Sequence, residues 1–473
     1  MTIFPNGSRL LSSIQSIQGR LWLLEHLEVC AARDGDLFSL RGWRSPTVTI
    51  ASRPDTVQAI AIAESNQLER VTDDKLQFPG MVNPVPGWIQ GHSPLSQQRF
   101  DAVFQDQHLR TYGHLIREMT LAMMNDWPLG TVQSVHLKTS MLSRQLILRV
   151  VFGIEDEQRF QRLAPDITLL LQRFDSLRRA RGLLSPLCRY PLCGWHLLDW
   201  TPWKRFLRLR QRLDPLLEAE IQNCGQPSIE SRNDLLQFFL AAEYQAREAI
   251  SDPESDTELR NSVLGFLFMC HETIASALVW ALYWIDSSPG VCDRMVQEID
   301  ALGPEPDAIA VSQLPYLTAV CLETLRLRPI FPFRLACKVK QAFKLMDASL
   351  EQGTILMPCG YLVHRCPEVY PEPGRFEPER FLGKQFSDNE YFPFGEWSNT
   401  CPGAFFAQFE LKLALATLLS HFQLTIDERH AAGLVRRNLV TTNAQGLKMT
   451  IRRRLGQAWK RQHLPEQYSG MRI

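Results

Sequence analysis

Several common signatures are missing from this sequence. None of its 11 cysteines forms a C-x-x-C pair, and the odd number argues against the disulfide framework of a secreted protein. Lys plus Arg and Asp plus Glu both number 51, so no excess of one charge points to nucleic acid or to a highly charged partner. Internal repeats and low-complexity linkers are missing as well. We therefore expect a protein of the reducing cytoplasm that binds no nucleic acid.

No segment predicts a membrane span. Near the N-terminus, the apolar run Leu21–Leu24 is flanked by charged residues, and it is too short for a span or a signal peptide. A longer apolar run extends from Glu258 to Ile285, but Arg260, His271 and Glu272 interrupt it. This run predicts a buried central helix rather than a membrane helix.

The remaining pattern is mostly helical, and 45% hydrophobic residues are ample for a core. Periodicity and breaking residues predict the following elements: helices at 17–33, from 54, at 114–155, at 158–185 and from just after Cys401 through Leu419; strands at 36–40, 47–50, 355–358 and 422–426; and a hairpin over 438–451 that turns near 443–446.

One cysteine stands out by its position. Cys401 joins an irregular loop, marked by Gly and Pro, to an apolar helix. The unpaired N–H groups of a helix N-terminus favour negative charge, so we expect this thiol to be shifted toward its thiolate form. A thiolate there is a nucleophile, a redox sensor or a metal ligand.

Phe394, Gly395, Cys401, Pro402 and Gly403, at these spacings, resemble the haem-ligand loop of cytochrome P-450 enzymes. The resemblance extends over residues 17–453. It implies one cytochrome P-450 domain over 1–473, with 454–473 as a basic C-terminal tail. The fold is then mainly α with small β-sheets (α+β), with haem b between the long central helix and the cysteine loop.

The scaffold motifs support the same resemblance. Glu323 and Arg326 lie three residues apart, so they share one face of a predicted helix and can pair. The later run F-E-P-E-R-F supplies Arg380, which joins this pair in the resembled family. A buried ion network of this kind indicates a fixed geometry, here one that holds the loop presenting Cys401.

The long helix carries a second motif. His271 and Glu272 suggest a zinc protease, but the second histidine that such a site needs is replaced by Ala275. The resemblance instead implies that Glu272 and Thr273 are a catalytic acid–alcohol pair that delivers protons beside the haem iron. The alternative is that Glu272 leaves the helix toward bulk water.

The resemblance also implies the cofactor contacts. Cys401 would be the axial ligand of the haem iron, with Phe394 and Gly403 in the same loop. Arg334, on a strand over 333–335, would contact a haem propionate, and Arg99 is a further candidate for cofactor binding. Other positions depart from the family pattern: Pro94, Gln98 and Asn399 stand where propionate partners are expected, Trp397 where a glycine is, and Met269 and Cys270 where small residues are.

The leading hypothesis is a haem-thiolate monooxygenase, monomeric, acting on a lipophilic small molecule. Two apolar segments, 68–89 and 185–206, fall where the family covers its substrate. Electrons would come from NAD(P)H only indirectly, through a separate ferredoxin or flavin-containing reductase. Two alternatives remain: a haem-thiolate enzyme of rearrangement, dehydration or peroxide chemistry, and a haem-poor pseudoenzyme acting as a binding or partner protein.

Overall fold

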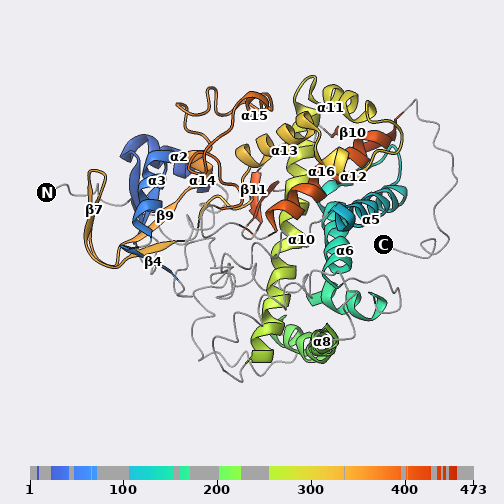
Figure 1. Cartoon of the computed structure of the whole chain (residues 1–473), viewed down its shortest axis with the longest axis horizontal. Coiled ribbons are helices and arrows are strands. Elements are labelled where there is room, and N and C mark those ends of the chain that lie inside the picture. Colours follow the sequence, from blue (N-terminus) through green and yellow to red (C-terminus); the bar gives the residue numbers. More distant parts are fainter. Residues whose placement is uncertain are drawn as a thin grey trace.

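The computed structural model describes residues 8–9, 23–41, 47–64, 66–71, 106–152, 160–170, 202–224, 255–334, 336–395, 401, 403–427, 434–437, 440–443 and 447–454. Within them the chain is mainly α-helical with small β-sheets, as predicted. The longest helix, α10 (Ser255–Ser287), runs through the middle of the molecule (Figure 1).

The other helices surround α10 or cover the largest sheet. They are α2 (Leu23–Asp34), α3 (Pro54–Glu64), α5 (Asp106–Asn125), α6 (Val135–Phe152), α8 (Pro202–Cys224), α11 (Val291–Asp300), α12 (Ala308–Ser312), α13 (Pro315–Leu327), α14 (Gly360–Val363), α15 (Arg380–Gly383) and α16 (Ala404–His421). Pro315 occupies the first turn of α13, where its missing N–H would have no partner in any case.

The largest sheet has six strands in the order β1-β2-β3-β9-β6-β4. These are β1 (Ser8–Arg9), β2 (Leu37–Arg41), β3 (Thr47–Ala51), β9 (Ile355–Pro358), β6 (Cys337–Val339) and β4 (Leu68–Arg70). The strands β3 and β9 pair in parallel, with Val48 aligned to Ile355. This pairing joins the N-terminal part of the chain to the distant segment that contains β9. With α2 and α3, this sheet forms one end of the molecule's long axis (Figure 1).

Three smaller sheets complete the fold. One has the order β10-β13-β5, with β10 (Phe422–Ile426), β13 (Lys448–Arg453) and β5 (Val132–Ser134); the others are the pairs β11 (Leu434–Arg437) with β12 (Val440–Asn443) and β7 (Phe343–Leu345) with β8 (Ala348–Leu350). Because β5 directly precedes α6, the β5–β13 pairing fixes the start of that helix.

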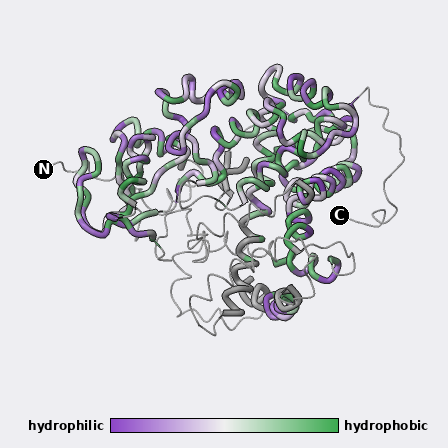
Figure 2. Tube along the Cα trace, in the orientation of Figure 1, coloured by the Kyte–Doolittle hydropathy of each residue, from purple (hydrophilic) through white to green (hydrophobic). Residues whose placement is uncertain are grey.

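The main hydrophobic core lies among α5, α6, α10, α13 and α16. Leu146, Leu278 and Leu415, from three of these helices, are fully buried. Hydrophobic residues dominate α6 and α16, whereas α5 is more hydrophilic (Figure 2). None of the described helices combines the length and apolar character that crossing a membrane requires.

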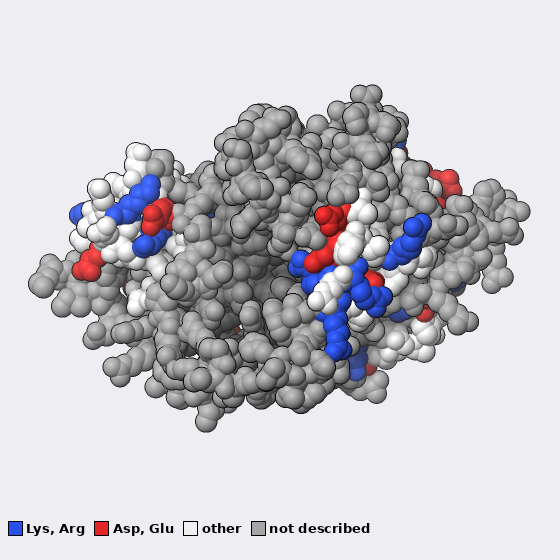
Figure 3. Space-filling model, turned by 90° about the horizontal axis from the view of Figure 1, so that it is seen from below, with Lys and Arg blue, Asp and Glu red and all other residues white. Residues whose placement is uncertain are grey.

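Charged side chains of both signs lie close together on the face seen from below (Figure 3). Along α8, Arg210 pairs with Asp214 at 2.8 Å, and Arg212 pairs with Asp166 at 2.9 Å. Exposed pairs of this kind contribute about 0–1 kcal/mol each. They neutralise charge locally, in line with the equal numbers of acidic and basic residues.

Two predictions about elements were wrong. The helix predicted over 114–155 is interrupted: α5 ends at Asn125, a turn with Gly130 at φ 74° follows, and β5 precedes α6. The hairpin predicted to turn near 443–446 turns earlier, since β11 pairs with β12 through Arg437 and Val440. At the first place, Pro128 and Gly130 were the missed turn signal.

The first residue of the predicted C-terminal tail is bound to the body of the protein. Arg452 and Arg453 belong to β13, and the Arg454 guanidinium donates to both carboxylate oxygens of Asp300, at 3.0 and 2.6 Å. The other basic residues of the tail, Lys460, Arg461 and Arg472, lie outside the described residues.

A close helix contact gives a first testable prediction. Gly113 of α5 faces α12, and a Cβ built on it would collide with the Cβ of Ala308. We expect Gly113→Ala to lower the free energy of unfolding by about 1–3 kcal/mol, because the helices must separate. Adding Ala308→Gly should return most of that loss, as measured by urea unfolding. Equal stability of Gly113→Ala and the unmodified protein would contradict the close contact.

Candidate active site

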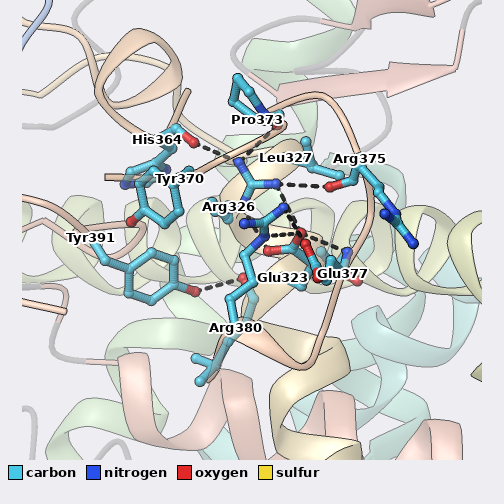
Figure 4. A network of polar contacts seen from close by, with 12 residues as sticks. Glu323, Arg326, Leu327, His364, Tyr370, Pro373, Arg375, Glu377, Arg380 and Tyr391 are labelled. Carbon is cyan, nitrogen blue, oxygen red and sulfur yellow. Dashed lines mark hydrogen bonds and ion pairs between the residues drawn. The ribbon is translucent and has the colours of Figure 1, made fainter. Parts of the chain in front are cut away.

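A buried polar network lies on the carboxyl-terminal half of α13 (Figure 4). Glu323 and Arg326 are both fully buried, and the Arg326 guanidinium donates to both carboxylate oxygens, at 2.6 and 2.8 Å. Arg380 also donates to Glu323, at 3.2 Å. The three-residue network predicted from the sequence is confirmed.

The network extends beyond its three predicted members to backbone groups. Arg326 donates to the carbonyl oxygens of His364, Pro373 and Arg375, at 2.7, 3.0 and 3.1 Å, and the backbone N–H of Glu377 donates to Glu323 at 2.9 Å. A single guanidinium thereby fixes three points of the segment from His364 to Arg375. This fixes the chain that leads into the cysteine loop.

Two side chains connect this network to the loop itself. Burial and the charges of Arg326 and Arg365 lower the pKa of His364 to about 3, so the ring is neutral. Its Nε2 accepts a hydrogen bond from the backbone N–H of Phe392 at 3.0 Å. Nearby, the Tyr391 hydroxyl donates to the carbonyl oxygen of Leu322 on α13 at 2.8 Å. Through its ring and its carbonyl oxygen, His364 ties the Arg326 network to the cysteine loop.

The cysteine loop is closed by backbone hydrogen bonds. The Cys401 N–H donates to the Phe394 carbonyl oxygen at 2.7 Å, and the Cys401 carbonyl oxygen accepts from the Ala404 N–H at 3.1 Å. Gly395 turns the chain with φ 82°, a conformation that other residues rarely adopt. Gly403 is the N-cap of α16, and a Cβ on it would lie 3.9 Å from the Cys401 Sγ. The loop therefore presents the thiol in a fixed place.

The expectation of a thiolate at Cys401 was wrong for the protein without a ligand. The residue is open to solvent, but the surrounding protein desolvates the thiol and raises its pKa, and the Gly403 N–H lowers it by less. Cys401 lies three residues before the first residue of α16, in line with its predicted position at the junction of loop and helix. A positive partner such as a metal ion favours loss of the proton.

Glu272 of α10 turns inward rather than toward bulk water. Its Oε1 lies 3.0 Å from the Nε2 of His136, and its Oε2 accepts from the Ser140 hydroxyl at 3.3 Å. Both partners belong to α6. The adjacent Thr273 donates from its hydroxyl to the Cys270 carbonyl oxygen at 2.9 Å. The acid and the alcohol therefore sit side by side, with the acid held in place.

Cys270 of α10 lies close enough to Cys401 for the two thiols to interact electrostatically. Burial raises its pKa well above the usual value, and nearby Cys401 and Glu410 raise it further. The sequence placed Cys270 and Cys401 on separate elements 131 positions apart (401 − 270), and the structure brings them into one electrostatic environment. The side chain of Met269 is outside what the structure describes.

Arg334 is buried, but it does not lie on a strand as predicted. Its backbone N–H donates to the Pro358 carbonyl oxygen at 2.9 Å, and β6 begins only at Cys337. The residue as a whole is 7% exposed. The remaining sequence candidates and departures fall outside the described residues: Pro94, Gln98, Arg99, Trp397 and Asn399.

Sequence reasoning missed four polar residues next to this site: His136, Ser140, Ser143 and Glu410. The first three recur at the i, i+4 and i+7 positions of α6, a helix that is otherwise mostly apolar on its inner side. Polar residues repeating at helical spacing could have indicated from the sequence that this face of the helix contacts other polar groups. Glu410 is fully buried on α16, and burial raises its pKa to about 8.

Comparison with known proteins decides the family. The family model "Cytochrome P450" matches residues 96–450. The chain belongs to the cytochrome P450 family. Among the proteins it is similar to, cytochrome P450 135A1 of Mycobacterium tuberculosis is 28% identical over 96% of this chain and 97% of the relative.

Two further relatives from Mycobacterium tuberculosis are similar over most of their lengths. Cytochrome P450 135B1 is 25% identical over 95% of this chain and 91% of the relative. Cytochrome P450 138 is 28% identical over 74% of each. The P450 family implies haem, and the described residues fit it: one thiol at a fixed position, a glycine backbone beside its sulfur, and the buried cation of Arg334.

Proposed function

We propose that this P450 is a haem-thiolate monooxygenase that inserts one oxygen atom from O₂ into a lipophilic small molecule. The observation that carries the proposal is the closed loop from Phe394 to Cys401, which fixes one thiol at the start of α16. The acid–alcohol pair of α10 supports it, because Glu272 is held by two partners beside Thr273.

Each group of the site has a defined task in this proposal. Cys401 would be the axial ligand of haem b, with Phe394 and Gly403 shaping its loop and Arg334 opposing a propionate charge. Haem bound in this way supplies O₂ activation, and the balanced reaction takes two electrons and two protons and yields one hydroxylated product and one water. Glu272 and Thr273 hold and move those protons.

The electrons would originate from NAD(P)H and reach the site through a ferredoxin or a flavin-containing reductase. A monomeric state and a cytoplasmic location stay predictions, as does the assignment of residues 1–473 to one P450 domain. Arg99 stays a candidate for cofactor binding.

The proposal is tested first by absorption spectroscopy. We expect the purified, haem-supplied protein to show a strongly red-shifted Soret band when it is reduced and exposed to carbon monoxide. Cys401→Ser should lose that shift, because an alcohol does not replace the thiolate. Cys292→Ser, a change at another free cysteine on α11, is the matched control and should keep it.

Turnover separates the remaining alternatives. With NAD(P)H, a surrogate ferredoxin and its reductase, a panel of lipophilic compounds and ¹⁸O₂, a monooxygenase gives products with one ¹⁸O atom. Products without ¹⁸O would instead support rearrangement or dehydration. The absence of any Soret band after haem supply would overturn the proposal in favour of a binding protein.

A further inference from the structure

The inner face of α6 carries a row of polar side chains inside the main core. His136, Ser140 and Ser143 are all buried, and the neighbouring Leu142 and Leu146 are packed in the surrounding apolar cluster. Burying polar groups in such surroundings destabilises the folded state unless they interact with other polar groups. Glu272 on α10 contacts His136 and Ser140, and Glu410 on α16 lies close enough to Ser143 for that hydroxyl to lower the Glu410 pKa.

The contact at Glu272 is held from both sides. Its two carboxylate oxygens have different partners, His136 on one and Ser140 on the other. In addition, the Thr139 hydroxyl is 3.3 Å from the Ala275 carbonyl oxygen and 3.3 Å from the His136 carbonyl oxygen. Three consecutive contacts therefore tie the first two turns of α6 to the middle of α10. Glu272 cannot turn away without breaking its contacts with His136 and Ser140.

His136 is also close to the outside of the molecule. Its side chain is 9% exposed, and it lies in the first turn of α6, directly after β5. The next residue, Leu137, is 59% exposed. One nitrogen of the imidazole contacts Glu272. Of the two α6 side chains that contact this carboxylate, His136 and Ser140, only the imidazole is a chemical group that readily takes up and releases a proton near neutral pH.

We propose that His136 is the residue through which Glu272 exchanges protons with solvent, and that Ser140 positions the carboxylate for this exchange. The inference rests on the proposed monooxygenase function and adds to it the entry point of the two protons. His136 takes a proton from solvent and passes it to Glu272. The same proton leaves Glu272 on the Thr273 side, so charge and protons balance at each transfer.

The test uses two replacements of His136 in the haem-loaded protein. Leucine removes both the contact and the proton exchange, whereas glutamine can still donate to Glu272 but does not titrate. We expect His136→Gln to slow product formation at least tenfold, the lower end of general acid–base effects, and to release more of the electrons as hydrogen peroxide. The solvent deuterium isotope effect on kcat should rise. A wild-type rate in His136→Gln would overturn proton exchange at this residue.

A second readout is independent of turnover. A double-mutant cycle of His136→Leu and Glu272→Leu on Tm measures whether the two side chains are coupled in the folded protein. We expect each single change to lower Tm by roughly 2–4 °C and the double change to lower it no further than the larger single one. Additive shifts would overturn the contact on which the proposal depends.

A matched control comes from α5, where His114 lies 3.3 Å from Glu118 but its side chain is 73% exposed. His114→Gln should change neither the isotope effect nor Tm. If the wild-type protein inserts no ¹⁸O at all, the proposed function fails and proton exchange for it fails too. The Tm cycle then still shows whether α6 holds Glu272.

Discussion

Replacing Arg326 by leucine is expected to lower the free energy of unfolding by about 3–5 kcal/mol, the typical cost of breaking a buried ion pair from one side. Glu323 would keep a fully buried carboxylate, with Arg380 and the Glu377 backbone N–H as its remaining partners in the network. Three carbonyl oxygens, of His364, Pro373 and Arg375, would lose their donor as well. Urea unfolding, followed by far-ultraviolet circular dichroism, measures the change.

The effect should reach the haem site. Arg326 fixes the segment that contains His364, whose ring accepts from the backbone of Phe392 at the entry to the cysteine loop. We therefore expect Arg326→Leu to retain less haem than the unmodified protein after gel filtration. Arg326→Lys should recover little of the lost stability or of the lost haem, because one ammonium group cannot replace the five N–H donors that the guanidinium holds in a fixed plane.

An exposed pair with the same spacing provides the control. Arg375 contacts Glu372 at 3.1 Å, also three residues apart, but their side chains are 65% and 72% exposed. Arg375→Leu should change the free energy of unfolding by no more than about 0.5 kcal/mol. Equal losses for the buried and the exposed arginine would show that the network is not a structural anchor.

The second large effect concerns Glu410 and pH. Burial raises the pKa of its carboxyl from 4.5 to about 8, and the Ser143 hydroxyl lowers it only in part. Neither carboxyl oxygen has a hydrogen bond of normal geometry among the described residues. The folded state therefore holds a proton that the unfolded chain releases. Its stabilising contribution is fully present below pH 4.5 and is lost as pH rises toward 8.

The expected size follows from that shift. Each pKa unit corresponds to about 1.4 kcal/mol, so the free energy of unfolding should fall by about 4 kcal/mol between pH 4.5 and pH 9 on account of this residue alone. Glu410→Gln cannot ionise, so its stability should exceed that of the unmodified protein at pH 9, and the difference should shrink toward pH 5. Urea unfolding at pH 5, 7 and 9 measures it.

Other groups also titrate in this range, so the quantity to compare is the difference between the two proteins at each pH. Glu372→Gln, at a side chain that is 72% exposed, should show no such pH-dependent difference. A constant difference for Glu410→Gln across the three pH values would mean that the Glu410 carboxyl is ionised in the folded state at all of them.

The sequence by itself determined the family and the frame of the site. Glu323 and Arg326 at a helical spacing, Arg380 in its later motif, and Cys401 before an apolar helix were all identified correctly, and the structure joins the first three in one network. These features are local, because each depends on the spacing of residues within one segment. Such a spacing can be read directly from the sequence. The long helix α10 was predicted for the same reason, from an apolar run of helical length.

Only the tertiary structure decided what surrounds those residues. His136 comes from α6 and Glu410 from α16, and no spacing relates His136 to Glu272, or Glu410 to Ser143 or Cys270. The position of Arg334 in a loop was decided by its backbone bond to Pro358, and the pKa of Cys401 by desolvation that outweighs the helix end. Burial and long-range pairing depend on how helices pack together, so the partner and the charge of each group followed from the fold.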